Sequence, residues 1–146
     1  MSNELIARAS EVIATRMWKG AEDYAQFYST LALIDLDGYP ATTTMSISKQ
    51  DGIQHLYFTT SLDSNAVKRI QQCNRASVCV NSAEYHISLV GTVEILTNSK
   101  IKQELWYEGI SGYFSGPEDP NYCVLRFTTE RYNLFIDDKV AIGKPD

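Results

Sequence analysis

The sequence predicts a mainly β fold, a small antiparallel β-barrel of six to seven strands with flanking helices. Three apolar, β-branched runs follow one another and are joined by the pairs Asp37-Gly38 and Asp51-Gly52. Such pairs are favoured in β-hairpin turns, so these runs form an antiparallel meander. Farther along the chain, the apolar residues switch between helix and strand periods, which places short helices between the later strands. A chain of 146 residues can bury a core of its own, and we expect one domain over residues 1–146.

The first element is a helix over about residues 3–18. Its apolar residues recur at intervals of three and four on one stripe, which consists of Leu5, Ile6, Ala9, Val12, Ile13 and Met17. From residue 29 onward the apolar period becomes that of strands. We therefore expect the first three strands over residues 29–36, 41–48 and 53–59.

The second half of the chain continues the barrel. We expect strands over residues 76–81, 86–96, 122–128 and 132–136, and a helix over about 99–108. Gly91 lies inside the longest of these strands and indicates a bulge or a bend. Ser99 is placed to cap the helix. The barrel so defined covers about residues 29–137, and residues 138–146 form a polar tail without periodicity.

The junction between the third strand and the next helix is the most informative segment. Residues 58–68, FTTSLDSNAVK, pass from a β-rich run through a cluster of hydroxyls into a helical pattern over about 64–73. Asp63 or Ser64 can be the N-cap, and Asn74 can end the helix in a left-handed conformation. Free N–H groups and hydroxyls at a helix N-terminus are a ready site for phosphate. An ordinary capped helix after a strand gives the same pattern.

Composition excludes several classes of function. A net charge of −5 and a pI near 5.0 argue against nucleic-acid binding. No stretch reaches the roughly 18 apolar residues of a membrane span, and the N-terminus lacks the features of a signal peptide, so we expect a cytoplasmic protein. Cys73, Cys79 and Cys123 show no CxxC spacing and are expected to be reduced. The only histidines, His55 and His86, form no ligand pattern, so we expect no metal. No linked nucleophile and base are visible, so no catalytic residue is assigned.

Four segments of the chain carry a family pattern. They are residues 33–40 (LIDLDGYP), residues 56–60 (LYFTT) with Ser64, residues 89–94 (LVGTVE), and a tail motif. The tail motif consists of Leu105-Trp106, residues 113–120 (YFSGPEDP) and residues 122–126 (YCVLR). In this order and spacing, over about residues 5–137, the chain resembles the FMN-binding split-barrel superfamily of pyridoxamine 5′-phosphate oxidase. Within it, the chain most resembles the general stress protein 26-like branch.

The resemblance implies a split barrel that forms a homodimer, with FMN in the groove between the two barrels. It implies that the strand-to-helix junction holds the phosphate, the second strand runs along the flavin, and the partner chain covers the ring. Carried over by position, the cofactor-binding residues are Thr43, Thr44, Met45 and Ser48 on the second strand, Phe58, Thr59, Thr60, Ser64 and Asn65 at the junction, and His86 and Trp106 near the ring. Trp106, Tyr113 and Phe114 can equally be core or interface aromatics.

The chain departs from the oxidase pattern at its cationic positions. Oxidases of the superfamily usually have an arginine at the position of Thr43 and basic residues at those of Asn65 and Ala66. Each lost charged hydrogen bond to phosphate costs about 1.5–3 kcal/mol, so we expect weaker FMN binding. Lys68 lies one turn into the helix, and its long side chain can reach back to compensate.

Two functions of different class stay open. The first is a flavin-dependent oxidoreductase, in which the flavin carries the chemistry and the protein orients it. The second is a non-catalytic flavin- or nucleotide-binding stress protein, or a degenerate dimeric barrel whose cofactor site is empty. Oxidation of pyridoxamine 5′-phosphate itself is disfavoured, because it requires a grip on a second phosphate and the chain offers few cations.

Overall fold

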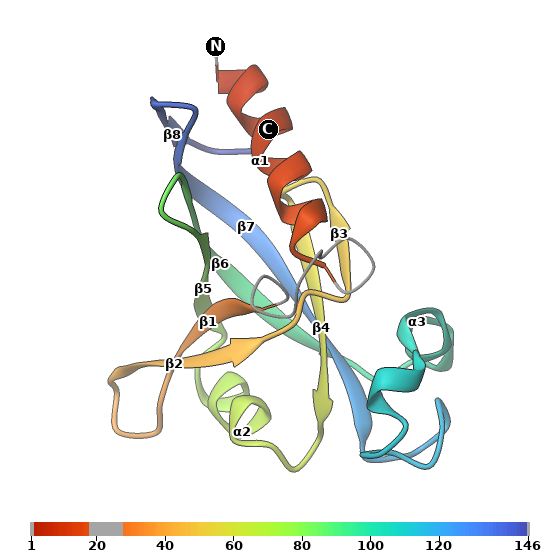
Figure 1. Cartoon of the computed structure of the whole chain (residues 1–146). Coiled ribbons are helices and arrows are strands. Elements are labelled where there is room, and N and C mark those ends of the chain that lie inside the picture. The colour runs from red at the N-terminus through yellow and green to blue at the C-terminus, as the bar shows by residue number, and fades with distance from the viewer. Residues whose placement is uncertain (1, 18–27, 146) are drawn as a thin grey trace.

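The computed structural model describes residues 2–17 and 28–145, in which α-helices lie beside one open antiparallel sheet (Figure 1). The sheet has eight strands in the order β2-β1-β5-β6-β7-β4-β3, with β8 paired to β7. The bounds are β1 Ser29–Ile34, β2 Pro40–Met45, β3 Lys49–Asp51, β4 His55–Ser61, β5 Arg75–Asn81, β6 His86–Leu96, β7 Tyr122–Ile136 and β8 Lys139–Gly143. The mainly β prediction is confirmed. Among the described strands, the edges β2 and β3 do not pair with each other, which leaves the barrel split between them.

The predicted strand over residues 41–48 divides at this split. β2 ends at Met45 and pairs with β1, whereas β3 begins at Lys49 and pairs with β4. Between them, the Ser48 N–H donates to the Tyr57 carbonyl at 2.7 Å. Residues 46–48 therefore carry the chain from one edge of the sheet to the other.

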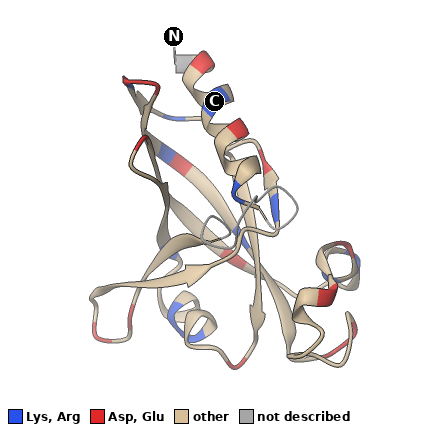
Figure 2. Cartoon of the chain, in the orientation of Figure 1, with Lys and Arg blue, Asp and Glu red and all other residues tan. Residues whose placement is uncertain are grey.

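Three α-helices are described, α1 Ser2–Thr15, α2 Asn65–Gln72 and α3 Ser99–Leu105, together with the short 3₁₀-helix η2 Glu108–Ile110. The apolar stripe predicted for the first helix is confirmed, because Leu5, Ala9, Val12 and Ile13 are buried in the core. The predicted end of that helix, at residue 18, lies outside the described residues. Charged residues lie mainly on helices and turns, and neither β1 nor β2 carries one (Figure 2).

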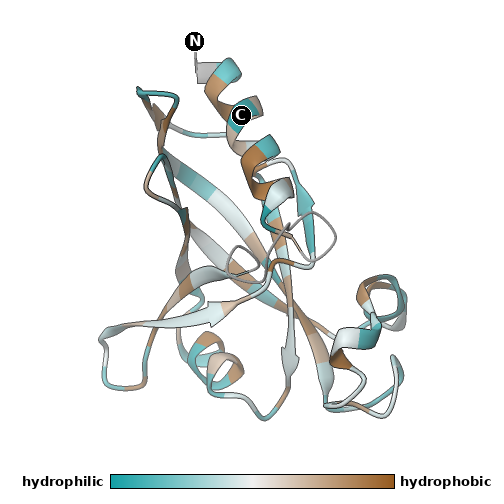
Figure 3. Ribbon diagram, viewed as in Figure 1, coloured by the Kyte–Doolittle hydropathy of each residue, from teal (hydrophilic) through white to brown (hydrophobic). Residues whose placement is uncertain are grey.

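The main core lies inside the curved sheet, and its apolar residues run along α1 and the central strands (Figure 3). Alternate residues of β1, Leu31 and Leu33, are buried there with Val67 and Ile70 of α2. A smaller cluster between α3 and the start of β7 consists of Tyr57, Leu105, Ile110, Tyr122 and Val124. This second cluster supports the candidate site described below.

The bulge predicted at Gly91 is confirmed. The register between β6 and β7 shifts between Val90 and Gly91, which leaves Glu130 as the additional residue on β7. A Cβ atom at Gly91 would collide with the carbonyl oxygen of Thr128, so this position requires glycine. The bulge also lets β7 continue through the gap that was predicted between residues 128 and 132, so the prediction of two final strands is wrong.

Two predicted helix ends are wrong. Asn74 is not left-handed, because the chain leaves α2 through an extended Cys73 (φ −150°) and enters β5 directly, with the Asn74 carbonyl accepting the Val93 N–H at 2.9 Å. The cap of α3 is Asn98 rather than Ser99, since the Asn98 side chain accepts the Ile101 N–H at 3.0 Å. α3 also ends earlier than expected, before the segment that forms η2.

The prediction of a polar tail over residues 138–146 is wrong for residues 139–143, which form β8. Asp137 and Asp138 have positive φ values of 56° and 62° and form a two-residue turn from β7 into β8. Asp tolerates this left-handed backbone better than most residues, so the Asp-Asp pair acts as a hairpin turn.

Candidate functional site

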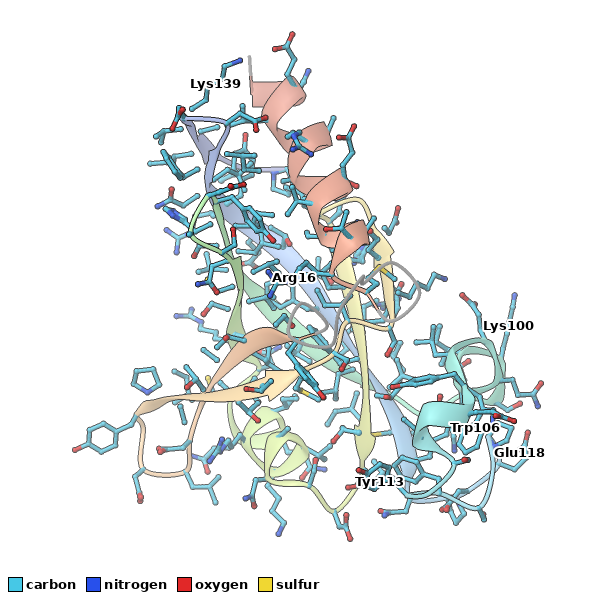
Figure 4. The ribbon with its side chains drawn as sticks, viewed as in Figure 1. Arg16, Lys100, Trp106, Tyr113, Glu118 and Lys139 are labelled. Carbon is cyan, nitrogen blue, oxygen red and sulfur yellow. The ribbon has the colours of Figure 1, made fainter. Side chains whose placement is uncertain are left out.

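A hollow of about 490 Å³ lies where the ends of β2 and β4 face the segment that follows α3. One side of it, the hydroxyl wall, consists of Thr44, Ser46, Thr59, Thr60 and Ser61. The other side, the aromatic wall, consists of Tyr107, Ile110, Tyr113 and Phe114. Tyr28, Met45 and Asn121 complete the lining. We call this feature the hydroxyl–aromatic hollow. Figure 4 labels Tyr113 and, on the same segment, Trp106.

The hydroxyl wall is positioned by backbone hydrogen bonds. The last residues of β4, Thr59, Thr60 and Ser61, pair with the start of β7 in unbroken register. On β2, Thr44 pairs with Thr30 of β1. Because both strands are fixed by a neighbour, the backbone positions from which these side chains project are defined. Each hydroxyl can donate one hydrogen bond and accept others, so this wall suits a polar ligand edge or an anion.

The aromatic wall is held by one buried ring. Tyr122 is fully buried, and its ring lies 5.2 Å from that of Phe114 and 5.5 Å from that of Trp106. Its hydroxyl donates to the Lys102 carbonyl at 2.8 Å, while Lys102 Nζ donates to the Asp119 carbonyl at 3.0 Å. Lys102 is only 7% exposed. These contacts fasten α3 and the segment after it around Tyr122.

Tyrosines border the mouth of the hollow. Burial raises the pKa of Tyr107, and the nearby phenols of Tyr28 and Tyr113 raise it further, so Tyr107 keeps its proton at neutral pH and can donate it in a hydrogen bond. Tyr113 is 81% exposed. The Tyr28 carbonyl accepts Arg16 Nη2 at 2.8 Å, and Arg16 Nη1 also donates to the Asn81 carbonyl at 2.8 Å. The buried Arg16 therefore holds Tyr28 against the start of the sheet.

The predicted phosphate end lies at the N-terminus of α2. Ser64, one of the two predicted candidates, is the N-cap, and its Oγ accepts the Val67 N–H at 3.2 Å. Asn65 and Lys68 are exposed and are not part of the lining. No lysine or arginine of the described residues lines the hollow. The polar groups it offers to an anion are therefore hydroxyls and amides.

The hollow brings together four of the residues predicted to bind cofactor, and they are Thr44, Met45, Thr59 and Thr60. The other residues predicted on the second strand, and Phe58 on β4, lie outside the lining. Thr43 is half-buried and pairs with Leu31, Ser48 lies beside Tyr57, and Phe58 is fully buried in the main core. For these residues, a direct contact with the cofactor remains a prediction.

The two residues predicted near the ring lie apart from the hollow as well. Trp106 packs in the small cluster around Tyr122. His86 stacks on Phe135 at 5.9 Å and pairs with it near the end of β7, whereas the hollow lies at the start of β7, next to Ser61. His86 can therefore reach a ligand in the hollow only from a second copy of the chain.

Sequence reasoning missed most of the aromatic wall as a site. The signal that could have found it is the turn-rich run GISGYFSGPEDP at residues 109–120, which places aromatic residues among glycines and prolines. Ser46, Ser61 and Asn121 were missed too, because each lies at or beside the end of a strand and no pattern marks its direction.

A second hollow, of about 580 Å³, lies on the outer side of β1, β5 and β6. Its floor includes Ala32, Ser77, Val90 and Thr92, and its rim includes Arg75, Glu130 and Arg131. Ala32, Ser77 and Val90 form one row across the three strands. We call this feature the outer hollow. Its floor is small and uncharged, and its rim carries both signs of charge.

Other kinds of site find no support in the described part of the chain. It contains no group of three or more His, Cys, Asp or Glu residues arranged to hold a metal. Burial raises the pKa of the Cys123 thiol to about 11, which suits a structural cysteine rather than a nucleophile. None of the described helices is both long and apolar enough to cross a membrane.

The sequence matches the family described as "Pyridoxamine 5'-phosphate oxidase like" over residues 6–135. The chain belongs to this family. No curated protein sequence matches it. A solved structure from Clostridium acetobutylicum, of a protein related to general stress protein 26 of B. subtilis, is 25% identical, with a TM-score of 0.79 over 98% of this chain and 96% of that chain. General stress protein 26 from Bacillus anthracis is 21% identical, with a TM-score of 0.72 over 92% and 98% of the two chains.

A third structure comes from Nostoc punctiforme and is described as a pyridoxamine 5'-phosphate oxidase-related, FMN binding protein. It is 18% identical, with a TM-score of 0.66 over 95% of this chain and 96% of that chain. The split-barrel fold and the family resemblance are thereby confirmed.

Proposed function

We propose that this chain binds FMN in the hydroxyl–aromatic hollow and acts as a flavin-dependent oxidoreductase. The observation that carries the proposal is the pairing of the hydroxyl wall with the aromatic wall. A flavin ring is flat and apolar on its faces, and its edges carry carbonyl and N–H groups, so it uses both kinds of wall. The FMN-binding neighbour from Nostoc punctiforme supports the choice of ligand.

The size of the hollow is consistent with this ligand. Small-molecule sites usually measure about 300–1,000 Å³, and this hollow measures about 490 Å³. The ring would lie against Tyr107 and Phe114, with Thr44 and Met45 along its edge. The phosphate would lie at the end of the hollow nearest Ser61, towards the N-terminus of α2.

Hydroxyls and helix N–H groups would hold the phosphate in place of the missing cations. Threonine stands at position 43, where the resemblance implies arginine, and Asn65-Ala66 stands where it implies one or two basic residues. We therefore expect FMN to bind in the micromolar range and to be preferred over riboflavin by about tenfold, the worth of one or two hydrogen bonds to phosphate.

Bound FMN would supply hydride and electron transfer, which the side chains around the hollow do not offer. The chain's own residues would bind and orient the ring, with Tyr107 and Phe114 lying against it. We do not propose oxidation of pyridoxamine 5′-phosphate, because the lining contains no described cation to hold a second phosphate.

The proposal includes a homodimer. The floor of the outer hollow is uncharged across three strands, so a second copy could cover it without burying a charge. Its rim places Glu130 beside Arg131, so the same patch on a second copy could pair with it around a two-fold axis. A dimer could also bring His86 of a second copy towards the flavin.

Light scattering should give twice the chain mass of 16.4 kDa, and Val90→Arg on the floor of the outer hollow should give the monomer. A wild-type monomer at micromolar concentration would reject the dimer.

The experiment that tests flavin binding is the visible absorbance spectrum of the purified protein with and without added FMN. A shifted and structured flavin band that stays with the protein through gel filtration supports the proposal. Anaerobic addition of NADH or NADPH then separates the two function classes. Bleaching of the bound flavin, followed by recovery in air, indicates an oxidoreductase. Binding without bleaching by either nucleotide favours the non-catalytic flavin-binding protein, and no binding favours the degenerate barrel.

A further inference from the structure

The turn between β4 and α2 places a carboxylate next to the polar end of the hydroxyl–aromatic hollow. This turn carries one acidic position, and the basic residues of α2 follow it (Figure 2). Asp63 Oδ1 accepts the Asn121 side-chain amide at 3.5 Å, and the Ser61 hydroxyl also donates to this carboxylate. Ser61 and Asn121 both line the hollow. The Asp63 carboxylate therefore does not line the hollow itself but is hydrogen-bonded to two residues that do.

The carboxylate is ionised at neutral pH. Hydrogen bonds from Ser61, and next from Asn121, hold the pKa of Asp63 below its usual range. Lys68 lies near enough to lower this pKa further, but it forms no ion pair with Asp63 in the described structure. Ser64 adds no charge at this end, and its oxygen already accepts the Val67 N–H as the cap of α2. This end of the hollow thus combines the partial positive charge of a short helix with a full negative charge.

A phosphate monoester carries a charge of about −1.5 to −2 at pH 7, and it would meet this carboxylate at the end of the hollow. Like charges a few ångströms apart repel each other even in water, and Asp63 is exposed to solvent. The uncharged ribityl chain of riboflavin would meet no such penalty, and its hydroxyls can bond the same Ser61 and Asn121 groups.

We propose that Asp63 is a specificity-determining residue that weakens the binding of phosphorylated flavin relative to unphosphorylated flavin. This inference rests on the proposed binding of flavin in the hollow. It limits the preference for FMN to the expected value of about tenfold, because one carboxylate offsets much of what the helix N-terminus and the hydroxyl wall contribute. A single substitution should therefore convert it into a selective FMN binder.

The test compares FMN and riboflavin affinities, measured by quenching of flavin fluorescence, in the full-length protein. Asp63→Asn should tighten FMN by about tenfold and change riboflavin by less than about twofold. Asp63→Glu, which keeps the charge, should retain the wild-type ratio of the two affinities. The matched control is Asp37→Asn in the turn between β1 and β2, which removes the same charge, keeps an Asn-Gly turn and should leave both affinities unchanged.

The outcomes separate this inference from the proposed function. If both flavins bind and Asp63→Asn leaves their ratio unchanged, or shifts both affinities equally, the inference is wrong and flavin binding stands. The inference is also wrong if Asp37→Asn tightens FMN as much as Asp63→Asn does, since the effect would then be one of net charge. If no variant binds either flavin, the proposed function and the inference are both rejected.

Discussion

The two walls of the hydroxyl–aromatic hollow are built in different ways. The hydroxyl wall lies on strand ends whose backbone is fixed by the β4–β7 and β1–β2 ladders. The aromatic wall lies on a segment without strand pairing and depends on contacts around the buried ring of Tyr122. Backbone hydrogen bonds thus fix one side and side-chain packing the other. Substitutions in the aromatic wall should therefore change stability and ligand binding together, whereas those in the hydroxyl wall should change ligand recognition alone.

The largest effect on stability is expected from Tyr122→Ala. This change removes a fully buried ring that contacts Phe114 and Trp106, so it should lower the free energy of unfolding by about 3–5 kcal/mol. Urea denaturation measures the loss. Tyr122→Phe keeps the ring and removes only the hydrogen bond to the Lys102 carbonyl, which should cost about 1–2 kcal/mol. A loss below about 1 kcal/mol for the alanine variant would contradict the central role of this ring.

A smaller effect is expected from Phe114→Ala, which removes a half-buried ring of the aromatic wall. The loss of part of its buried area should cost about 1–2 kcal/mol. FMN and riboflavin should weaken by the same factor, because both would stack on this wall through the same ring. Fluorescence titration with each flavin checks this. A variant that loses FMN alone would show that Phe114 acts on the phosphate and not on the ring.

The next largest effect on stability is expected from loss of the N-cap of α2. Ser64→Ala removes the acceptor for the Val67 N–H and should destabilise the protein by about 1 kcal/mol. Ser64→Asp, which restores a capping oxygen, should recover most of that stability. Because aspartate adds a second negative charge beside Asp63, the same variant should bind FMN less tightly than wild type. Unchanged stability of Ser64→Ala in urea denaturation would indicate that the cap makes no net contribution.

The smallest effect on stability, with a clear effect on recognition, is expected from Thr60→Val. Valine keeps the shape and the strand preference of threonine, so the free energy of unfolding should change by less than about 0.5 kcal/mol. Loss of the hydroxyl should weaken FMN by about tenfold and leave riboflavin unchanged. Thr42→Val on β2, an exposed residue that lines neither hollow, is the matched control and should change neither affinity. Equal weakening of both flavins by Thr60→Val would remove this residue from the phosphate end.

The same contrast explains how much of the molecule the sequence could predict. Periodicity and turn residues predicted β6 with a bulge or bend at Gly91, and the helix after β4 with a cap at Asp63 or Ser64, because each depends on local backbone preferences. The aromatic wall depends on contacts such as those of Lys102 with the Asp119 carbonyl and with the Tyr122 hydroxyl. These join residues 17 and 20 positions apart in a segment without periodicity, so no local pattern reveals them.

The second limit on predicting the site from the sequence was the direction in which each side chain points. Thr43 and Thr44 are equivalent in a run of threonines, yet only Thr44 lines the hollow. Thr43 is half-buried and Thr44 is exposed, and a run of three threonines does not indicate which of them faces the core. His86 was expected near the ring, and its distance from the hollow along β7 follows from the strand order, which the sequence did not reveal.

The most direct test of the central claim, that the hydroxyl–aromatic hollow binds FMN, is a titration of FMN fluorescence with purified wild-type protein. We predict saturable quenching at one FMN per chain, a dissociation constant in the micromolar range, and riboflavin binding that is weaker by about tenfold. Equal affinity for the two flavins would contradict the placement of the phosphate at the end near Ser61. Fluorescence that stays unquenched at protein concentrations far above micromolar would contradict flavin binding itself.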